Sequence, residues 1–241
     1  MKKFFDKDEV WFAVVWIVVY VIGFANADSL SESIGIPKLL TVLFGFVAAI
    51  ILLGFIRKHK LKKDFGLCLP AKHGKAYLYY LPLILISSVN FWCGVTIRAT
   101  FLEILLYIVS MCFVGILEEV IFRGLLFKGM CKSNVTAAII VSSLTFGVGH
   151  IVNLLLGEPV FDTLLQLVYA SAIGFCYTAF FHVSGSILPC ILSHIFVNST
   201  SIFAIEPTPS ANIIITVAQT VLGVGYGLWL LHKAPVKNQS M

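Results

Sequence analysis

Long apolar segments alternate with short polar ones along the whole chain. Most of the apolar segments approach the ~20 consecutive residues that a helix needs to cross a membrane. Eight such spans are expected, at residues 10–25, 38–56, 76–97, 104–127, 136–156, 163–182, 186–203 and 213–231. The connecting segments are short, apart from a basic one at 57–75, so successive helices should pack antiparallel. The pattern therefore predicts an all-α polytopic membrane protein with about eight transmembrane helices in a single bundle.

The composition agrees with this prediction. Of the 241 residues, 59% are apolar and 12% are charged, and the mean hydropathy is +0.97. These values lie outside the range of ordinary soluble domains. The six cysteines are scattered over several spans with no C-x-x-C spacing, so neither a disulfide framework nor a thiolate metal site is indicated.

The positive charges are unevenly divided between the two sides that eight spans define. Fifteen of the seventeen lysines and arginines, Arg123 included, fall on the side of the termini, and Lys38 and Arg98 fall on the other. Cytoplasmic loops of membrane proteins carry an excess of Lys and Arg. We therefore expect both termini in the cytoplasm. The compact chain of 241 residues, without targeting extensions, fits a multi-pass protein of a bacterial plasma membrane. The net charge of +5 then reflects topology and does not indicate nucleic-acid binding.

The chain is expected to form one structural domain with three parts. Residues 1–104 hold the N-terminal helices and the basic cytoplasmic loop 57–75, residues 105–205 hold the polar motifs, and residues 206–241 hold the last helix and a basic tail. The N-terminus imitates a secretory signal that ends at Ala25-Asn-Ala27. Three acidic residues before its apolar run, and the length of that run, favour a true membrane span.

Glu118, Glu119 and Arg123 interrupt an otherwise almost wholly apolar segment. Ionisable groups at membrane depth cost a few kcal/mol each, and they usually mark functional sites. Residues four apart share one face of a helix, so Glu119 is expected to pair with Arg123. Glu118 points about 100° away from Glu119 and is therefore the candidate general base. A buried salt bridge that only fixes helix register is the structural alternative.

Two further polar pairs follow at helical spacing, Phe146-x-x-x-His150 and His194-x-x-x-Asn198. At ~1.5 Å rise per residue, Glu118, both histidines and Asn198 lie roughly 12 to 21 Å from the inner ends of their helices, so they can meet in mid-membrane. Pro189, Gly147 and Gly149 are expected to supply kinks or close backbone approach.

These three motifs resemble those of the CPBP intramembrane proteases, which include the CAAX-prenyl endoproteases and bacterial relatives linked to bacteriocin processing or self-immunity. The matching sequences, in chain order between residues 105 and 203, are Glu118-Glu119-Val-Ile-Phe-Arg123, Phe146-Gly-Val-Gly-His150 and His194-Ile-Phe-Val-Asn198. The resemblance implies hydrolysis of a peptide bond in a membrane-associated, prenylated or leader peptide. It implies that Glu118 and His150 activate a water and that His194 and Asn198 hold the carbonyl oxygen, with Glu119 and Arg123 in support.

The sequence leaves open whether a metal takes part and whether the protein is an enzyme. Carboxylates and two histidines are also compatible with a zinc site, but the H-E-x-x-H signature is absent and Asn198 suits an oxyanion donor better than a ligand. Metal-free water activation is therefore slightly favoured. The expected partners are a peptide or lipidated peptide and the lipid bilayer, with no nucleic acid. The rival functions are a proton-coupled transporter and a non-catalytic membrane immunity or binding protein.

Overall fold

The chain is helical throughout the part that the computed structural model describes, residues 1–69 and 80–233, apart from connecting loops and an isolated bridge between Val95 and Ala204. The α-helices are α1 (Lys2–Lys7), α2 (Glu9–Ser33), α3 (Leu39–Lys58), α4 (Leu81–Ser87), α5 (Phe101–Glu119), α6 (Lys128–Cys131), α7 (Val135–Gly149), α8 (Val160–Ser184), α9 (Leu188–Thr200) and α10 (Pro209–Lys233). A π-helix, η3 (Val120–Phe127), continues α5. Three 3-10 turns are η2 (Val89–Phe91), η4 (His150–Leu156) and η5 (Ser201–Phe203).

Several helices begin where the local sequence supplies a cap. The Asp8 and Asn134 side chains accept from the backbone N–H groups of Trp11 and Ala137, each at 2.9 Å, at the starts of α2 and α7. Thr100 and Glu103 form a reciprocal capping box at the start of α5. Such caps satisfy backbone donors that have no partner within the helix.

Six helices are long and apolar enough to cross a membrane, so the predicted count of about eight is not confirmed for the described part of the chain. The two differences are at 186–203 and 76–97. Leu188–Phe203 forms a shorter apolar helix. Of the expected span 76–97, residues 76–79 lie outside the described part, and α4 ends at Ser87. The chain then turns, with a positive φ at Gly94, a conformation that suits glycine.

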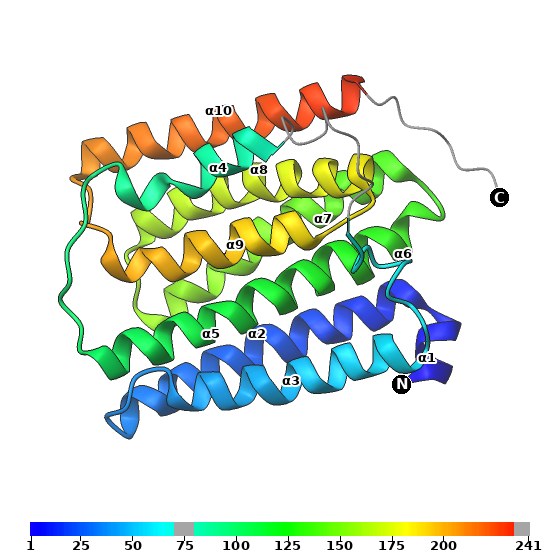
Figure 1. Cartoon of the computed structure of the whole chain (residues 1–241), viewed down its shortest axis with the longest axis horizontal. Helices are drawn as coiled ribbons and strands as arrows, with labels where there is room; N and C mark the ends of the chain where they lie inside the picture. Colours follow the sequence, from blue (N-terminus) through cyan, green and yellow to red (C-terminus); the bar gives the residue numbers. More distant parts are fainter. Residues whose placement is uncertain (70–79, 234–241) are drawn as a thin grey trace.

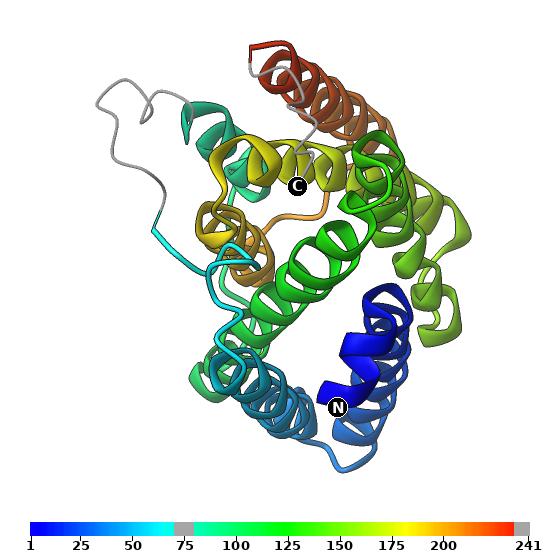
Figure 2. The same ribbon diagram turned by 90° about the vertical axis from the view of Figure 1, so that its right-hand side faces the viewer.

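The helices run side by side along the long axis of the molecule (Figure 1). An end-on view places α5 in the middle of the bundle, between α2 and α3 on one side and α8, α9 and α10 on the other (Figure 2). Helix α5 packs against α3 and α9, while α8 packs against α7 and α10. The motif-bearing segments are therefore neighbours in space.

One end of the bundle is here called the basic end. It is formed by the N-terminus and by residues 59–69, 128–134 and 184–187. Its contacts include the Lys132–Glu9 ion pair at 2.6 Å and a backbone hydrogen bond from Ile187 N–H to Gly66 O at 3.0 Å. Its described cations are Lys2, Lys3, Lys7, Arg57, Lys58, Lys60, Lys62, Lys63, Lys128, Lys132 and Lys233. The remainder of the predicted basic loop, 70–75, and the tail 234–241 lie outside the described part.

The opposite end, here called the distal end, is formed by the loops 34–38, 92–100, 157–159 and 204–208. The bridge between Val95 and Ala204 and a hydrogen bond from Thr96 N–H to Phe203 O at 2.8 Å join two of these loops. Lys38 lies here and pairs with Asp28 at 2.7 Å.

Small residues let the central helices approach closely, as is common in membrane bundles. A side chain at Gly147 would collide with Ser171 of α8, which confirms the expected close approach there. Gly149 has open space beside it. Pro189 lies in the first turn of α9 and so begins that helix, which makes the expected kink at this position wrong. Proline is tolerated in a first turn because its missing N–H would have no intrahelical partner there.

Candidate active site

The first motif lies where α5 passes into the π-helix η3. Helix α5 ends at Glu119, and every residue of Val120–Phe127 is buried. π-Helical turns are rare and occur frequently at functional sites. Here the change of helix type lies between the two glutamates and the arginine that follows them.

Glu119 and Arg123 form an ion pair in which Arg123 Nη1 lies 3.0 Å from Glu119 Oε1. Neither side chain exposes any surface. Arg123 Nη2 also donates to the Gly174 carbonyl on α8 at 3.2 Å, and its guanidinium lies 4.2 Å from the centre of the Phe146 ring. The predicted pairing is therefore confirmed. Because Arg123 is buried inside the bundle, its charge does not count towards the orientation of the chain.

His194 lies between the two glutamates and links α9 to α5. Its Nδ1 atom lies 2.9 Å from Glu119 Oε1, and its Nε2 atom lies 3.3 Å from Glu118 Oε2. Glu118 is 8% exposed and His194 is 6% exposed. Both ring nitrogens thus face carboxylates, and the imidazole has a fixed orientation.

Tyr20 of α2 holds the other oxygen of Glu118. Its hydroxyl donates to Glu118 Oε1 at 2.5 Å inside the bundle. Tyr20 cannot be recognised from the sequence, because a single tyrosine in an apolar helix carries no spacing signal. The expectation that Glu118 projects away from the Glu119–Arg123 pair is compatible with this geometry, but its carboxylate is engaged on both sides.

Phe146 contacts all three motifs. Its ring meets the His150 and His194 rings edge to face, at 5.6 Å between centroids in each case, and lies against Arg123. In the structure it sets the spacing between the two histidines and the arginine.

His150 and Asn198 border the same region. His150 begins η4, directly after α7, and is half-buried. Asn198 is also half-buried, one turn beyond His194 on α9. His150 borders one cavity with Glu118 and another with His194 and Asn198, so the four predicted residues lie in one region of the bundle. The contacts that link Arg123, Glu119, His194, Glu118 and Tyr20 do not include His150 or Asn198.

Two cavities meet at this site. The larger has a volume of about 500 Å³ and is bordered by His150, His194 and Asn198. The smaller has a volume of about 140 Å³ and is bordered by Tyr20, Glu118 and His150. Their shared lining residues are Met111, Phe146, His150 and Asn153. His150 thus borders both cavities, with the general-base candidate on one side and the oxyanion candidates on the other.

The donor arrangement does not fit a zinc ion. Among the side chains that the structure describes, no group of three or more His, Cys, Asp or Glu is placed to hold a metal. A catalytic zinc site needs about three such ligands and an open position. His194 has both ring nitrogens facing carboxylates.

Comparison with known proteins places the motifs in one family. Residues 100–200 match the family model described as type II CAAX prenyl endopeptidase, Rce1-like. All three motifs lie within the matched residues, whereas Tyr20 lies outside them. Neither a search of curated proteins nor a search of solved structures found a match to the chain.

Proposed function

Because the chain is an intramembrane protease of the CPBP family, with its Rce1-like CAAX endopeptidase domain at residues 100–200, we propose that it hydrolyses a peptide bond with a water activated by Glu118 and His150. The observation that carries this proposal is the position of Glu118. Its carboxylate borders a cavity, is oriented by Tyr20 and faces His194. A carboxylate held in this way can accept a proton from a water that attacks a bound carbonyl.

In the first step the water oxygen bonds to the carbonyl carbon while Glu118 takes the proton of the water. His150 orients this water from the opposite wall of the smaller cavity. The carbonyl oxygen becomes an oxyanion. In the second step the C–N bond breaks, and Glu118 returns the proton to the leaving amine. The products are a carboxylic acid and an amine, and Glu118 is again ionised.

His194 and Asn198 are the proposed oxyanion donors. His194 Nδ1 lies 2.9 Å from Glu119 Oε1, and its Nε2 atom lies 3.3 Å from Glu118 Oε2, an oxygen without a hydrogen-bond partner of its own. When Glu118 accepts the proton of the water, its attraction for His194 Nε2–H weakens. That donor is then available to the oxyanion together with the Asn198 amide. Donors held in a low-dielectric site are worth about 3 kcal/mol each to the transition state.

Glu119 and Arg123 hold this machinery in place and do not touch the substrate. Glu119 accepts from His194 Nδ1 and is itself held by Arg123, which is anchored on Gly174 O. This arrangement sets the direction of the His194 ring, as second partners of catalytic and metal-binding histidines commonly do.

The proposed topology has eight passes with both termini in the cytoplasm of a bacterial plasma membrane. It is supported by the shorter helices α4 and α9, which run alongside the longer ones (Figure 1). It is also supported by the start of α2 and the end of α10, which lie at the basic end. The excess of cations at that end indicates the cytoplasmic side.

Prenylated, leader and bacteriocin peptides are the proposed substrate classes, with processing or self-immunity as the physiological role. The test compares the membrane peptidomes of cells that express wild type or Glu118→Gln at equal abundance. The matched control is Glu32→Gln, which neutralises an exposed carboxylate at the distal end. New peptide termini with wild type and Glu32→Gln, but not with Glu118→Gln, are expected. Identical termini in all three strains, with folded protein and native substrates present, would refute proteolysis.

A further inference from the structure

The larger cavity follows one face of α9 away from the catalytic groups. His194, Val197, Asn198 and Ser201 border it in succession, and the loop residue Ile205 continues the same wall. Spacings of three and four residues place these side chains on one helical face. From His194 to Ser201 the rise along the helix is about 10 Å. The cavity thus extends from the middle of the bundle to the distal loop 204–208.

The other walls run in the same direction. On α8 the lining extends from Tyr177 to Gln166, towards the distal start of that helix at Val160. On α10 it extends from Gln219 to Asn212, again towards the distal start of the helix. On these two helices the lining therefore extends from the middle of the bundle towards the distal end.

The smaller cavity also extends towards the distal end. It runs along α2 from Tyr20 through Phe24 to Asp28, and it also includes Thr41 of α3 and Leu156 at the end of η4. Asp28 and Thr41 are bonded to one another at the distal end. Both cavities therefore lead from the catalytic groups to the distal end.

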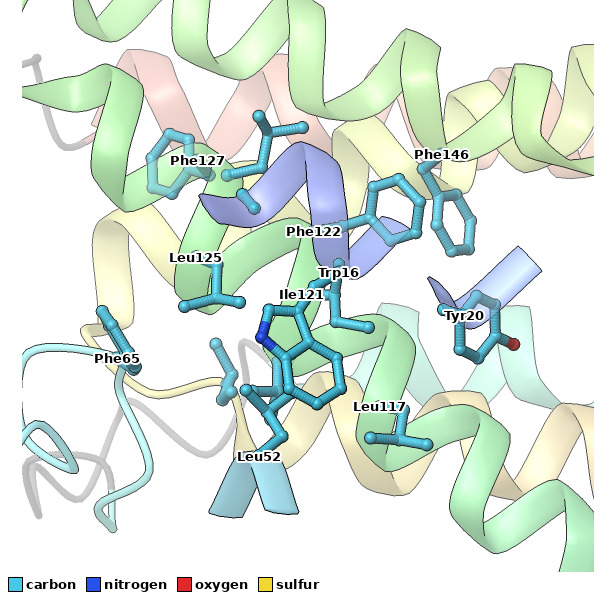
Figure 3. Packing of buried hydrophobic residues seen from close by; sticks show 14 of the residues in the cluster. Trp16, Tyr20, Leu52, Phe65, Leu117, Ile121, Phe122, Leu125, Phe127 and Phe146 are labelled. Carbon is cyan, nitrogen blue, oxygen red and sulfur yellow. The ribbon is translucent and has the colours of Figure 1, made fainter. Parts of the chain in front are cut away.

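Packed side chains close the path to the basic end. All eight residues of Val120–Phe127 are buried directly below Glu119, and Phe65, Phe181 and Ile187 are buried beside them. Figure 3 shows this packing, with Ile121, Leu125 and Phe127 in the cluster and Tyr20 and Phe146 near its edge. Interiors packed in this way leave few voids larger than a water molecule.

The charges assign these ends to the two sides of the membrane. The cations of the basic end mark the cytoplasmic side. The distal end has Lys38 and Arg98 as its described cations, and Lys38 is paired with Asp28. The open end of the active site is thus the end that faces away from the cytoplasm.

The lining of the larger cavity also indicates the kind of peptide that it accepts. None of the described residues that border it is Asp, Glu, Lys or Arg. Its amides are Asn90, Asn153, Gln166, Asn198, Asn212 and Gln219. Four of them already donate one hydrogen bond or more within the bundle, to groups on Val197, Gln166, Asp162 and Ile86. The amide donors and acceptors that these bonds leave over can pair with the C=O and N–H groups of an extended backbone. A charged side chain would be buried there without a counter-charge, at a high cost.

We propose that this protease takes its substrate from the non-cytoplasmic side, as an extended peptide segment without charged side chains next to the scissile bond. The inference rests on the proposed function. It favours the exported part of a secreted or membrane-anchored peptide over a lipidated C-terminus that faces the cytoplasm.

Cysteine labelling tests the side of access without a substrate. Val197→Cys places a thiol on the cavity wall one turn from His194. Right-side-out and inside-out membrane vesicles are treated with a membrane-impermeant maleimide, and labelled sites are identified by mass spectrometry. Native Cys93, which borders the cavity, and native Cys68, near the basic end, serve as references. Cys176 and Cys190 are fully buried and should not react.

We expect the thiols at 197 and 93 to react about tenfold faster in right-side-out vesicles, and Cys68 to react faster in inside-out vesicles, because a polar reagent does not cross the hydrocarbon layer. Ile215→Cys, on the α10 wall, repeats the test if Val197→Cys does not fold. Labelling at 197 that is faster in inside-out vesicles, equal in both, or absent from both would overturn the proposal.

Cleavage of a membrane-impermeant, uncharged peptide library tests the proposed proteolysis separately from the side on which the substrate enters. Glu118-dependent cleavage by the detergent-solubilised full chain reports proteolysis regardless of side. If the solubilised protein cleaves but vesicles cleave only when inside-out, the access proposal fails and the protease assignment stands. If labelling follows the expected pattern and the solubilised protein cleaves nothing, the access route stands and the proposed function fails.

Discussion

The Tyr20 hydroxyl donates a 2.5 Å hydrogen bond to Glu118 Oε1, inside the bundle. This bond connects α2, which lies outside the matched residues 100–200, to the proposed general base. The other Glu118 oxygen faces His194 Nε2 at 3.3 Å. The N-terminal half of the chain therefore contributes directly to the orientation of the proposed general base.

Tyr20→Phe removes this hydrogen bond and keeps the ring. Hydrogen bonds to charged groups contribute about 1.5–3 kcal/mol, so we expect kcat to fall about tenfold or more while KM changes little. The measurement is cleavage of a peptide identified with wild type. Tyr226→Phe, which removes a hydroxyl from α10 outside both cavity linings, is the control. Equal rates for Tyr20→Phe and wild type would show that Tyr20 does not position Glu118.

Arg123→Met is expected to destabilise the fold as well as to abolish activity. It leaves Glu119 buried without its cation, and breaking a buried pair in this way costs about 3–5 kcal/mol. The measurement is thermal unfolding in detergent together with peptide cleavage. Glu118→Gln serves as the comparison, because it should lose activity with a much smaller change in Tm. A Tm of Arg123→Met equal to that of Glu118→Gln would contradict the supporting role of the ion pair.

Asn198→Ala removes the proposed amide donor to the oxyanion. Loss of one such donor typically lowers kcat about 100- to 1000-fold, and KM should change little because the bond strengthens only in the transition state. Asn198→Asp, with the same size but no N–H donor in its ionised form, should be equally impaired. If Asn198→Asp retained wild-type kcat, the amide could not be an oxyanion donor.

Removal of metal ions is expected to leave cleavage unchanged. Both ring nitrogens of His194 face carboxylates, and among the described residues no set of His, Cys, Asp or Glu is placed to form a zinc site. The purified chain is assayed with and without a strong zinc chelator, and bound zinc is measured in parallel. Activity that disappears with the chelator and returns with added zinc would replace the Glu118–His150 mechanism with a metal-dependent one.

Local patterns in the sequence were sufficient for the helical membrane fold and for the Glu119–Arg123 pair. Spans were visible because each must be apolar over its whole length, and the ion pair because residues four apart on a helix are neighbours whatever surrounds them. Hydropathy was not sufficient for the count of long spans. It does not distinguish a spanning helix from a shorter one such as Leu188–Phe203 or α4, whose lengths depend on the turns and helices beside them.

Three relationships depend on the tertiary structure alone. Tyr20 and His194 lie on opposite sides of Glu118, and Phe146 lies between the two histidines. Both cavities extend to the distal end. These relationships join α2, α5, α7 and α9, and their atoms meet because of how whole helices pack. A repeat of 3.6 residues per turn determines which side chains share a face of one helix. It does not determine which face of another helix lies opposite, since that depends on packing between segments distant in the chain.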